Sequence, residues 1–219
     1  MVSNDPSRPS DAPSRAGSLP LVGGALALDF ANTAGGRGSP HPVEHLRDPT
    51  MLLAWAEHAG ILDSESGRHL RAACARDRAY GEALFADAIA LREAIHAVAT
   101  AIAEGERPPE VELTRIKDAC ARAIASGRLA PGEGGFAWTW PTDPPVPDTL
   151  LGPIALSAVG VMRDGDLSRL KRCAGEHCGW VFFDLTKNRG RRWCEMSVCG
   201  NRAKARRFTA RAVTGTKDR

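Results

Sequence analysis

The sequence predicts a mainly α-helical N-terminal domain with a short β element, followed by a small α+β module at the C-terminus. Apolar residues recur at helical spacing through much of the first 165 residues. Four of the six cysteines fall between residues 173 and 199. The charge also changes sign: residues 167–219 hold 14 Lys plus Arg against 4 Asp plus Glu, whereas residues 1–166 hold 15 against 22. We therefore expect an acidic body joined to a basic module that meets a polyanion.

The composition places the chain among globular proteins of one or two domains. It has 219 residues, of which 43% are hydrophobic and 25% charged, which excludes collagen-like, mucin-like and fully disordered chains. The longest apolar run, residues 150–162, is shorter than the roughly 18–20 residues of a membrane span. Asp29 interrupts the apolar stretch that resembles a signal peptide. We expect no membrane association and a cytoplasmic location.

The first third of the chain contains a polar tail, a loop and two short helices. Residues 1–18 are rich in Ser, Pro, Asp and Arg and are expected to be disordered. The folded part begins with residues 21–30, and residues 31–41 have the composition of a glycine-rich loop. Short helices are expected at 48–60 and 64–78.

The middle of the chain carries the strongest helical pattern. Apolar residues three and four apart predict a central amphipathic helix over 81–104: Leu84, Ala88, Leu91, Ile95, Val98 and Ile102. A second helix should follow Pro108 and Pro109 and end at Gly127. Its inward-facing side chains are expected to be Val111, Ile116, Cys120 and Ile124. Residues 134–140 alternate like a strand, and residues 148–162 should form an apolar helix leading to the C-terminal module.

The four clustered cysteines form two pairs. They are Cys173, Cys178, Cys194 and Cys199, which give C-x4-C, a fifteen-residue spacer and a second C-x4-C. Thiolates at this spacing suit one tetrahedral zinc ion, with the spacer folded as a hairpin. Two disulfides are the main alternative, but the cytosol keeps thiols reduced. With four thiolates and no open position, one zinc per chain should be structural rather than catalytic, with His177 pointing away.

The residues around these cysteines resemble a known family. The block over 173–208, with the tetrapeptide Cys-Gly-Asn-Arg at 199–202, resembles the CGNR zinc finger. LALDFANT at 26–33 and LREAI at 91–95 are similar to the ABATE domain, which accompanies this finger in predicted stress-induced bacterial transcription regulators. The resemblance covers about residues 20–212. It implies a zinc-dependent nucleic-acid-binding module fused to a mostly helical sensing domain.

The finger itself suggests how a polyanion is bound. We expect a strand at Trp180–Phe183, a returning strand at Arg192–Cys194, and a basic helix beginning near Cys199, with Ala203, Phe208 and Ala212 facing inward. The expected nucleic-acid-binding residues are Arg189, Arg191, Arg192, Asn201, Arg202, Lys204, Arg206, Arg207 and Arg211. Two of the arginines could instead balance the thiolates. Asn201 is equally suited to cap the helix or to hydrogen-bond a cysteine sulfur. Trp180 and Trp193 fit the finger's small core better than a stacking platform.

In the N-terminal domain, three polar residues lie in apolar segments. Asp29, Asn32 and Arg92 predict either a structural network or the wall of a ligand pocket. The Gly-Gly-Arg-Gly loop at 35–38 lacks the features of a phosphate-binding motif, and the histidines show no metal-binding spacing. No nucleophile, base and oxyanion site can be assembled, so we expect no enzyme.

These features favour a zinc-containing DNA-binding transcription regulator with a ligand-sensing N-terminal domain. The alternatives are a small-molecule-binding or catalytic domain whose zinc module mediates protein contacts, and an RNA-binding protein. A small-molecule effector and a second copy of the chain are further candidate partners. The expected division is a tail at 1–18, the helical domain at 19–165, the finger at 166–213 and a tail at 214–219. Loss of one zinc ligand should then unfold residues 170–212 alone.

Overall fold

The computed structural model describes residues 14–37, 39–132 and 134–215, with the side chains of the last helix described only as far as Thr209. The chain is 57% helical with short antiparallel strand pairs, which confirms the predicted fold class. The helices are α1 (Leu26–Ala31), α2 (Pro49–His58), α3 (Ser64–Arg76), α4 (Arg78–Glu104), α5 (Glu110–Ser126), α6 (Asp148–Asp164) and α7 (Asn201–Gly215). The strand pairs are β1 (Ala34–Gly35) with β2 (Val43–Glu44), β3 (Arg128–Gly132) with β4 (Gly135–Thr139), and β5 (Leu170–Arg172) with β6 (Val181–Phe183).

Aspartates begin three consecutive helices. The carboxylates of Asp48, Asp63 and Asp77 accept hydrogen bonds from backbone N–H groups in the first turns of α2, α3 and α4. The two short helices expected from the sequence are confirmed. The central helix begins three residues earlier than predicted, because Asp77 caps it at Arg78.

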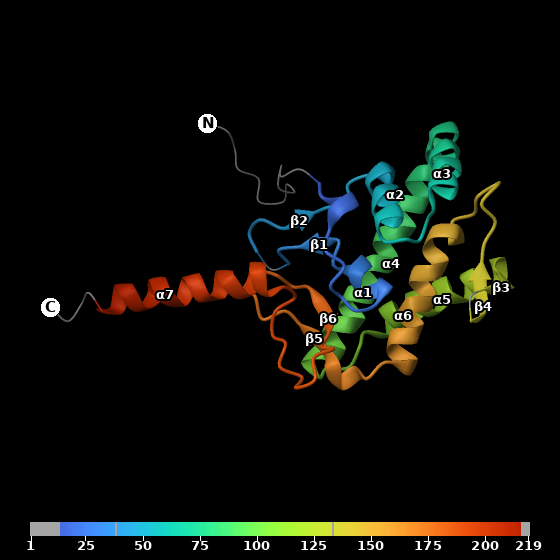
Figure 1. Cartoon of the computed structure of the whole chain (residues 1–219). Helices are drawn as coiled ribbons and strands as arrows, with labels where there is room; N and C mark the ends of the chain where they lie inside the picture. The colour runs from blue at the N-terminus through green and yellow to red at the C-terminus, as the bar shows by residue number, and fades with distance from the viewer. Residues whose placement is uncertain (1–13, 38, 133, 216–219) are drawn as a thin grey trace, which may run out of the picture.

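Helix α4 is the centre of the molecule and contacts α1, α2, α3, α5 and the strand pair β5–β6 (Figure 1). Its predicted apolar stripe is buried, apart from Ile102, which is only partly buried. In α5, Ile116 and Cys120 face the core as expected, but Val111 and Ile124 are 68% and 46% exposed. That part of the prediction was wrong, because α5 packs against α4 and α6 through a narrower stripe.

The finger shares its core with the helical domain. Leu170, Val181 and Phe183 from β5 and β6 join the same apolar cluster as the N-terminal helices. Phe182, on the opposite face of β6, packs instead among Cys173, Cys194 and Cys199. Because successive side chains of β6 point to opposite faces, this one strand contributes side chains to both apolar clusters.

The pairing of strands in the finger differs from the prediction. Strand β6 pairs with β5, which precedes the first cysteine, and not with residues 192–194. Arg192 instead accepts one backbone hydrogen bond from Ala174 N, at 2.9 Å, and the chain then enters a π-helical turn, Met196–Gly200. The returning segment is irregular because its backbone groups form hydrogen bonds within the cysteine knuckles instead of a second strand ladder.

The two ends of the described chain behave differently. Residues 1–13 and 216–219, which contain most of the expected tails, lie outside the described residues. Ser14–Ser18 were expected in the first tail, yet Ala16 is buried and Ser14 Oγ donates to His45 O at 2.7 Å. Helix α7 projects from the body as a single helix (Figure 1). Among the described helices, none has the length and apolar character needed to cross a membrane.

Candidate metal centre and nucleic-acid interface

The four predicted ligands meet at one point. The Sγ atoms of Cys173, Cys178, Cys194 and Cys199 all lie within 4.8 Å of one another. Cys194 Sγ is 3.6 Å from both Cys178 Sγ and Cys199 Sγ. A tetrahedron with Zn–S bonds of about 2.3 Å has sulfur atoms about 3.8 Å apart, so the thiolates fit one structural zinc ion. Zinc held here would crosslink the two knuckles and leave no open coordination position.

The backbone around the sulfurs supports this arrangement. The N–H groups of Gly175 and Cys194 donate to Cys173 Sγ, at 3.4 and 3.3 Å. A Cβ atom on Gly175 would lie 3.2 Å from Cys199 Sγ, so the first knuckle closes tightly over the site. His177 has an exposed side chain near Glu176 and is not part of the cluster, as expected.

A buried carboxylate that the sequence analysis missed organises the loop after β6. Asp184 is completely buried and accepts hydrogen bonds from Lys171 Nζ at 2.6 Å, Thr186 Oγ1 at 2.5 Å and Arg191 N at 2.9 Å. Burial would raise the pKa of Asp184, but these hydrogen bonds hold it well below its usual range. The group therefore remains ionised and fixes the loop that carries Arg191.

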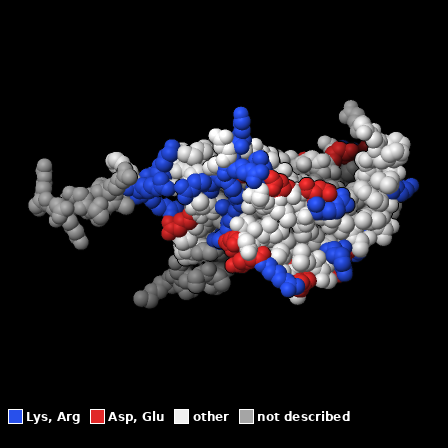
Figure 2. Space-filling view, turned by 90° about the horizontal axis from the view of Figure 1, so that it is seen from below, with Lys and Arg blue, Asp and Glu red and all other residues white. Residues whose placement is uncertain are grey.

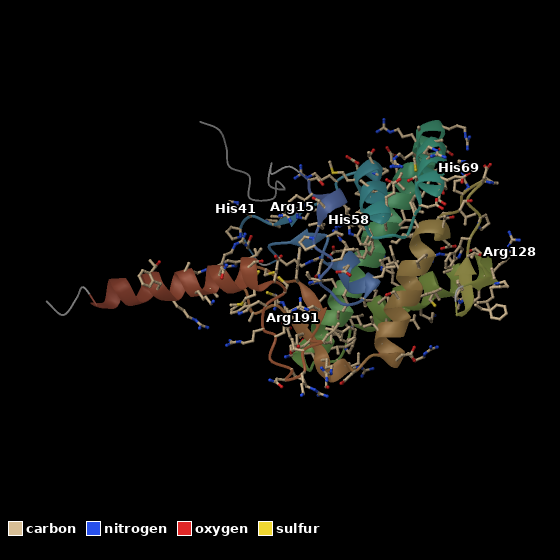
Figure 3. The ribbon with its side chains drawn as sticks, viewed as in Figure 1. Arg15, His41, His58, His69, Arg128 and Arg191 are labelled. Atoms are coloured by element: carbon tan, nitrogen blue, oxygen red, sulfur yellow. The ribbon has the colours of Figure 1, made fainter. Side chains whose placement is uncertain are left out.

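Arg191 was predicted to bind nucleic acid, but its guanidinium points into the protein. It donates to the carbonyl oxygens of Phe183, Val22 and Trp193, at 3.3, 3.0 and 3.1 Å, and to that of Cys194. Its Cζ lies 4.1 Å from the centroid of the Phe182 ring. Arg191 thus joins the second knuckle to Val22, in the segment that precedes α1, and Figure 3 labels it in the finger.

Arg189 and Arg192 differ from Arg191 in their surroundings. Arg189 donates to Asp166 Oδ2 at 3.3 Å and to Ser168 Oγ at 2.9 Å, so its charge is partly balanced. Arg192 is exposed, and its Cζ lies 5.7 Å from the Trp193 ring centroid. Of these three arginines, Arg192 offers the freest cation.

Helix α7 presents the largest group of exposed cations in the finger. Arg202, Lys204 and Arg207 are exposed and form no ion pair with the described residues. Arg206 pairs with Glu176 of the first knuckle. Arg211 belongs to α7, but its side chain lies outside the described part. Figure 2 shows the Lys and Arg side chains gathered over α7 and the finger, with both signs mixed over the helical body.

Two expectations for α7 need correction or refinement. Phe208 was expected to face inward but is 78% exposed, because none of the described elements packs against the projecting helix at that point. Asn201 neither accepts a capping bond nor contacts a sulfur in the described structure. Its Nδ2 donates to Ser197 O at 3.0 Å, which joins α7 to the preceding π-helical turn.

In the N-terminal domain, Asp29 and Arg92 have separate partners. Arg92 is 3% exposed and forms two 2.7 Å hydrogen bonds to the Glu44 carboxylate and one of 2.9 Å to Glu93. Asp29 instead accepts a 2.7 Å bond from Gly23 N, and burial raises its pKa. The observed partners favour the structural interpretation over the ligand pocket.

The Arg92 network extends to the finger. Arg37, from the glycine-rich loop, forms hydrogen bonds of 2.6 and 2.9 Å to Glu93. Burial would raise the pKa of Glu93, but Arg37 and Arg92 lower it to about 2. Gly179 lies against Arg37: it has φ +75°, and a Cβ there would meet Arg37 Cβ at 2.6 Å. Only glycine fits this junction without rearrangement.

Three more side chains link the domains. Asn32 Nδ2 donates to Val181 O and Val181 N donates to Asn32 Oδ1, both at 2.9 Å. Trp180 Nε1 donates to Ala34 O at 3.2 Å. His96 Nε2 lies 2.7 Å from Gly179 O. The histidines labelled in Figure 3 come from separate segments. His96, by contrast, lies at the interface between the domains, which the sequence pattern does not reveal.

Comparison with protein families agrees with this arrangement. Residues 24–165 match the ABATE family, described as "Putative stress-induced transcription regulator", and residues 169–212 match the CGNR zinc finger. The chain belongs to the ABATE family. The order of the ABATE region and the CGNR zinc finger is the one that the resemblance implied. No curated protein matches this ABATE-family chain.

Proposed function

We propose that this ABATE-family protein is a DNA-binding transcription regulator that contacts the duplex chiefly through α7. The observation that carries the proposal is the exposure of Arg202, Lys204 and Arg207 on a helix that projects from the body. Free cations on such a helix release counterions when they meet phosphates. The structural zinc, by holding the knuckles, would fix the root of this helix.

The dimensions and polarity of α7 support duplex DNA as the polyanion. An α-helix with its side chains is about 10–12 Å across, close to the roughly 12 Å width of the B-DNA major groove. None of the described side chains of α7 is buried, so packing against the body does not account for this helix. Asn201 and Arg202 lie at its N-terminal end, where amide and guanidinium groups can contact base edges.

The surface of the helical body carries charges of both signs, many of them in ion pairs, and such a surface does not suit the binding of a polyanion. We therefore assign the helical body a regulatory role. It shares a core with β5 and β6, so a change in its packing would reach the finger. The polar atoms of Asn32 and Arg92 are engaged by protein groups. An apolar cavity among α1, α4, α5 and α6 has a volume of only about 10 Å³, enough for one water molecule at most. We therefore do not place an effector at these positions.

Recovery of bound nucleic acid from cells tests the proposal. The tagged full chain and a variant with Arg202→Gln, Lys204→Gln and Arg207→Gln would be crosslinked in parallel, and DNA and RNA sequenced from each. The proposal expects discrete genomic DNA sites that the triple variant loses. Enrichment of RNA alone, or equal recovery of DNA by both proteins, would overturn it.

A further inference from the structure

An open groove lies beside the zinc centre, at the root of α7. Its volume is about 650 Å³, and it is bounded by the loop after β6 and by the π-helical turn. Gly200, where α7 follows this turn, packs against Trp193 and Met196, both of which line the groove. The groove is therefore continuous with the start of the basic helix.

The groove combines two kinds of surface. One wall is apolar and consists of Trp193, which is partly exposed, and Met196, which is 49% exposed. The rim carries the exposed cations Lys187 and Arg192 together with Asn188. A partly exposed aromatic side chain, with the Arg192 guanidinium 5.7 Å from its ring centroid, therefore lies beside cations that form no ion pair with the described residues.

Arg191 and Asp184 make this surface rigid. Arg191 is one of the residues that line the groove, and its guanidinium is held by backbone carbonyls. Asp184 holds Arg191 N and Thr186 at the base of the loop. Because both anchors are buried or engaged, the groove keeps its shape without a ligand.

We propose that this groove binds one unpaired nucleotide of a DNA strand, with its base against Trp193 and Met196 and its phosphate between Lys187 and Arg192. A nucleotide has an aromatic face and an anion a few ångströms apart, which matches the apolar wall and the basic rim. A free phosphate would leave the apolar wall unused, and a fully paired duplex cannot offer a base to it. The inference rests on the proposed DNA binding by α7, which would bring a strand to the groove.

The experiment compares two DNA probes on the full zinc-loaded chain. One is a blunt duplex, and the other is the same duplex extended by a short single strand of thymidines, with 3′ and 5′ extensions tested separately. Stacking of one base contributes on the order of 1–3 kcal/mol, so one polarity of extension should tighten Kd by about 5-fold or more. Met196→Ala and Lys187→Gln should each remove most of this gain.

The controls lie outside the groove. Leu185 is 72% exposed on the same finger without lining the groove, and Lys117 is an exposed lysine of α5. Leu185→Ala and Lys117→Gln should keep the full gain. Trp193 packs against the zinc cluster, so its replacement would confuse stacking with folding; Met196→Ala avoids that problem.

The outcomes separate the two proposals. If the blunt duplex binds but neither extension adds affinity, or if the groove variants keep the gain, the groove inference is overturned and DNA binding by α7 stands. If only single strands bind, and Met196→Ala weakens them, the groove is supported and the duplex proposal is overturned. Failure of both probes to bind at low salt would overturn both.

Discussion

Asn32 and Val181, 149 positions apart in the chain, form a reciprocal pair of hydrogen bonds in the interior. The Asn32 amide donates to the Val181 carbonyl and accepts from the Val181 N–H, each at 2.9 Å. Asn32 follows α1 of the helical domain, and Val181 begins β6 of the finger. The pair extends the edge of the finger's strand pair with a side chain from the other domain.

The first prediction concerns this pair. Asn32→Ala leaves both backbone groups of Val181 buried without a partner, so the free energy of unfolding should fall by about 2–4 kcal/mol. Urea denaturation of the full chain measures it. Asn188→Ala, which changes an exposed asparagine of the same finger, should alter stability by no more than about 0.5 kcal/mol. Equal stability of the two variants would contradict the structural role of Asn32.

The second prediction concerns zinc. Wild-type protein should contain about one zinc per chain and Cys194→Ser less than half, because structural sites need all their ligands. The sequence alone suggested that only residues 170–212 would unfold. Leu170, Val181 and Phe183 belong to the main core, so we now expect the helical domain to lose stability as well. Calorimetry in which the variant's helical domain melts at the wild-type temperature would contradict this coupling.

The third prediction separates two adjacent arginines. Arg191→Gln removes a cation from four carbonyl oxygens and should lower the free energy of unfolding by about 2–4 kcal/mol. Arg192→Gln, at an exposed position, should leave stability nearly unchanged. Thermal melts of both proteins provide the comparison. Similar melting temperatures would show that Arg191 is not a structural anchor.

The fourth prediction is a pH dependence. Burial, with a contribution from Arg37, lowers the pKa of His96 from 6.5 to about 4. The unfolded chain therefore binds a proton between pH 6.5 and 4 that the folded chain does not. The contribution of His96 to the free energy of unfolding is fully present above pH 6.5. The free energy of unfolding should fall by on the order of 3 kcal/mol as the pH drops from 6.5 to 4.

Denaturation of wild type and His96→Gln across this range tests the pH prediction. The variant should show a flatter profile, with the residual slope coming from groups such as His45, whose pKa is also lowered by burial. Parallel profiles for the two proteins would show that His96 is not the group responsible.

The features that could be predicted from the sequence are those with local signals. The cysteine spacing identified the zinc site because two ligands with four residues between them can bend onto one ion, and helical periodicity identified α4. Asn32, His96 and Arg191 form hydrogen bonds with backbone groups of segments that are distant in the sequence. Such contacts produce no recognisable sequence pattern around these three residues. Strand β5 has only three residues and was missed. Phe208 was misassigned because helical spacing does not reveal whether a partner element exists.

The salt dependence of DNA binding by the full chain tests the central claim most directly. A plot of log K against log salt concentration should have a slope of about −0.9 per phosphate contacted. In the variant with Arg202→Gln, Lys204→Gln and Arg207→Gln, the slope should become shallower by the equivalent of about three phosphate contacts. A control variant of the helical body, with Lys117→Gln, Arg122→Gln and Arg163→Gln together, should keep the wild-type slope. Binding that is independent of salt, or a triple α7 variant with the wild-type slope, would contradict the account.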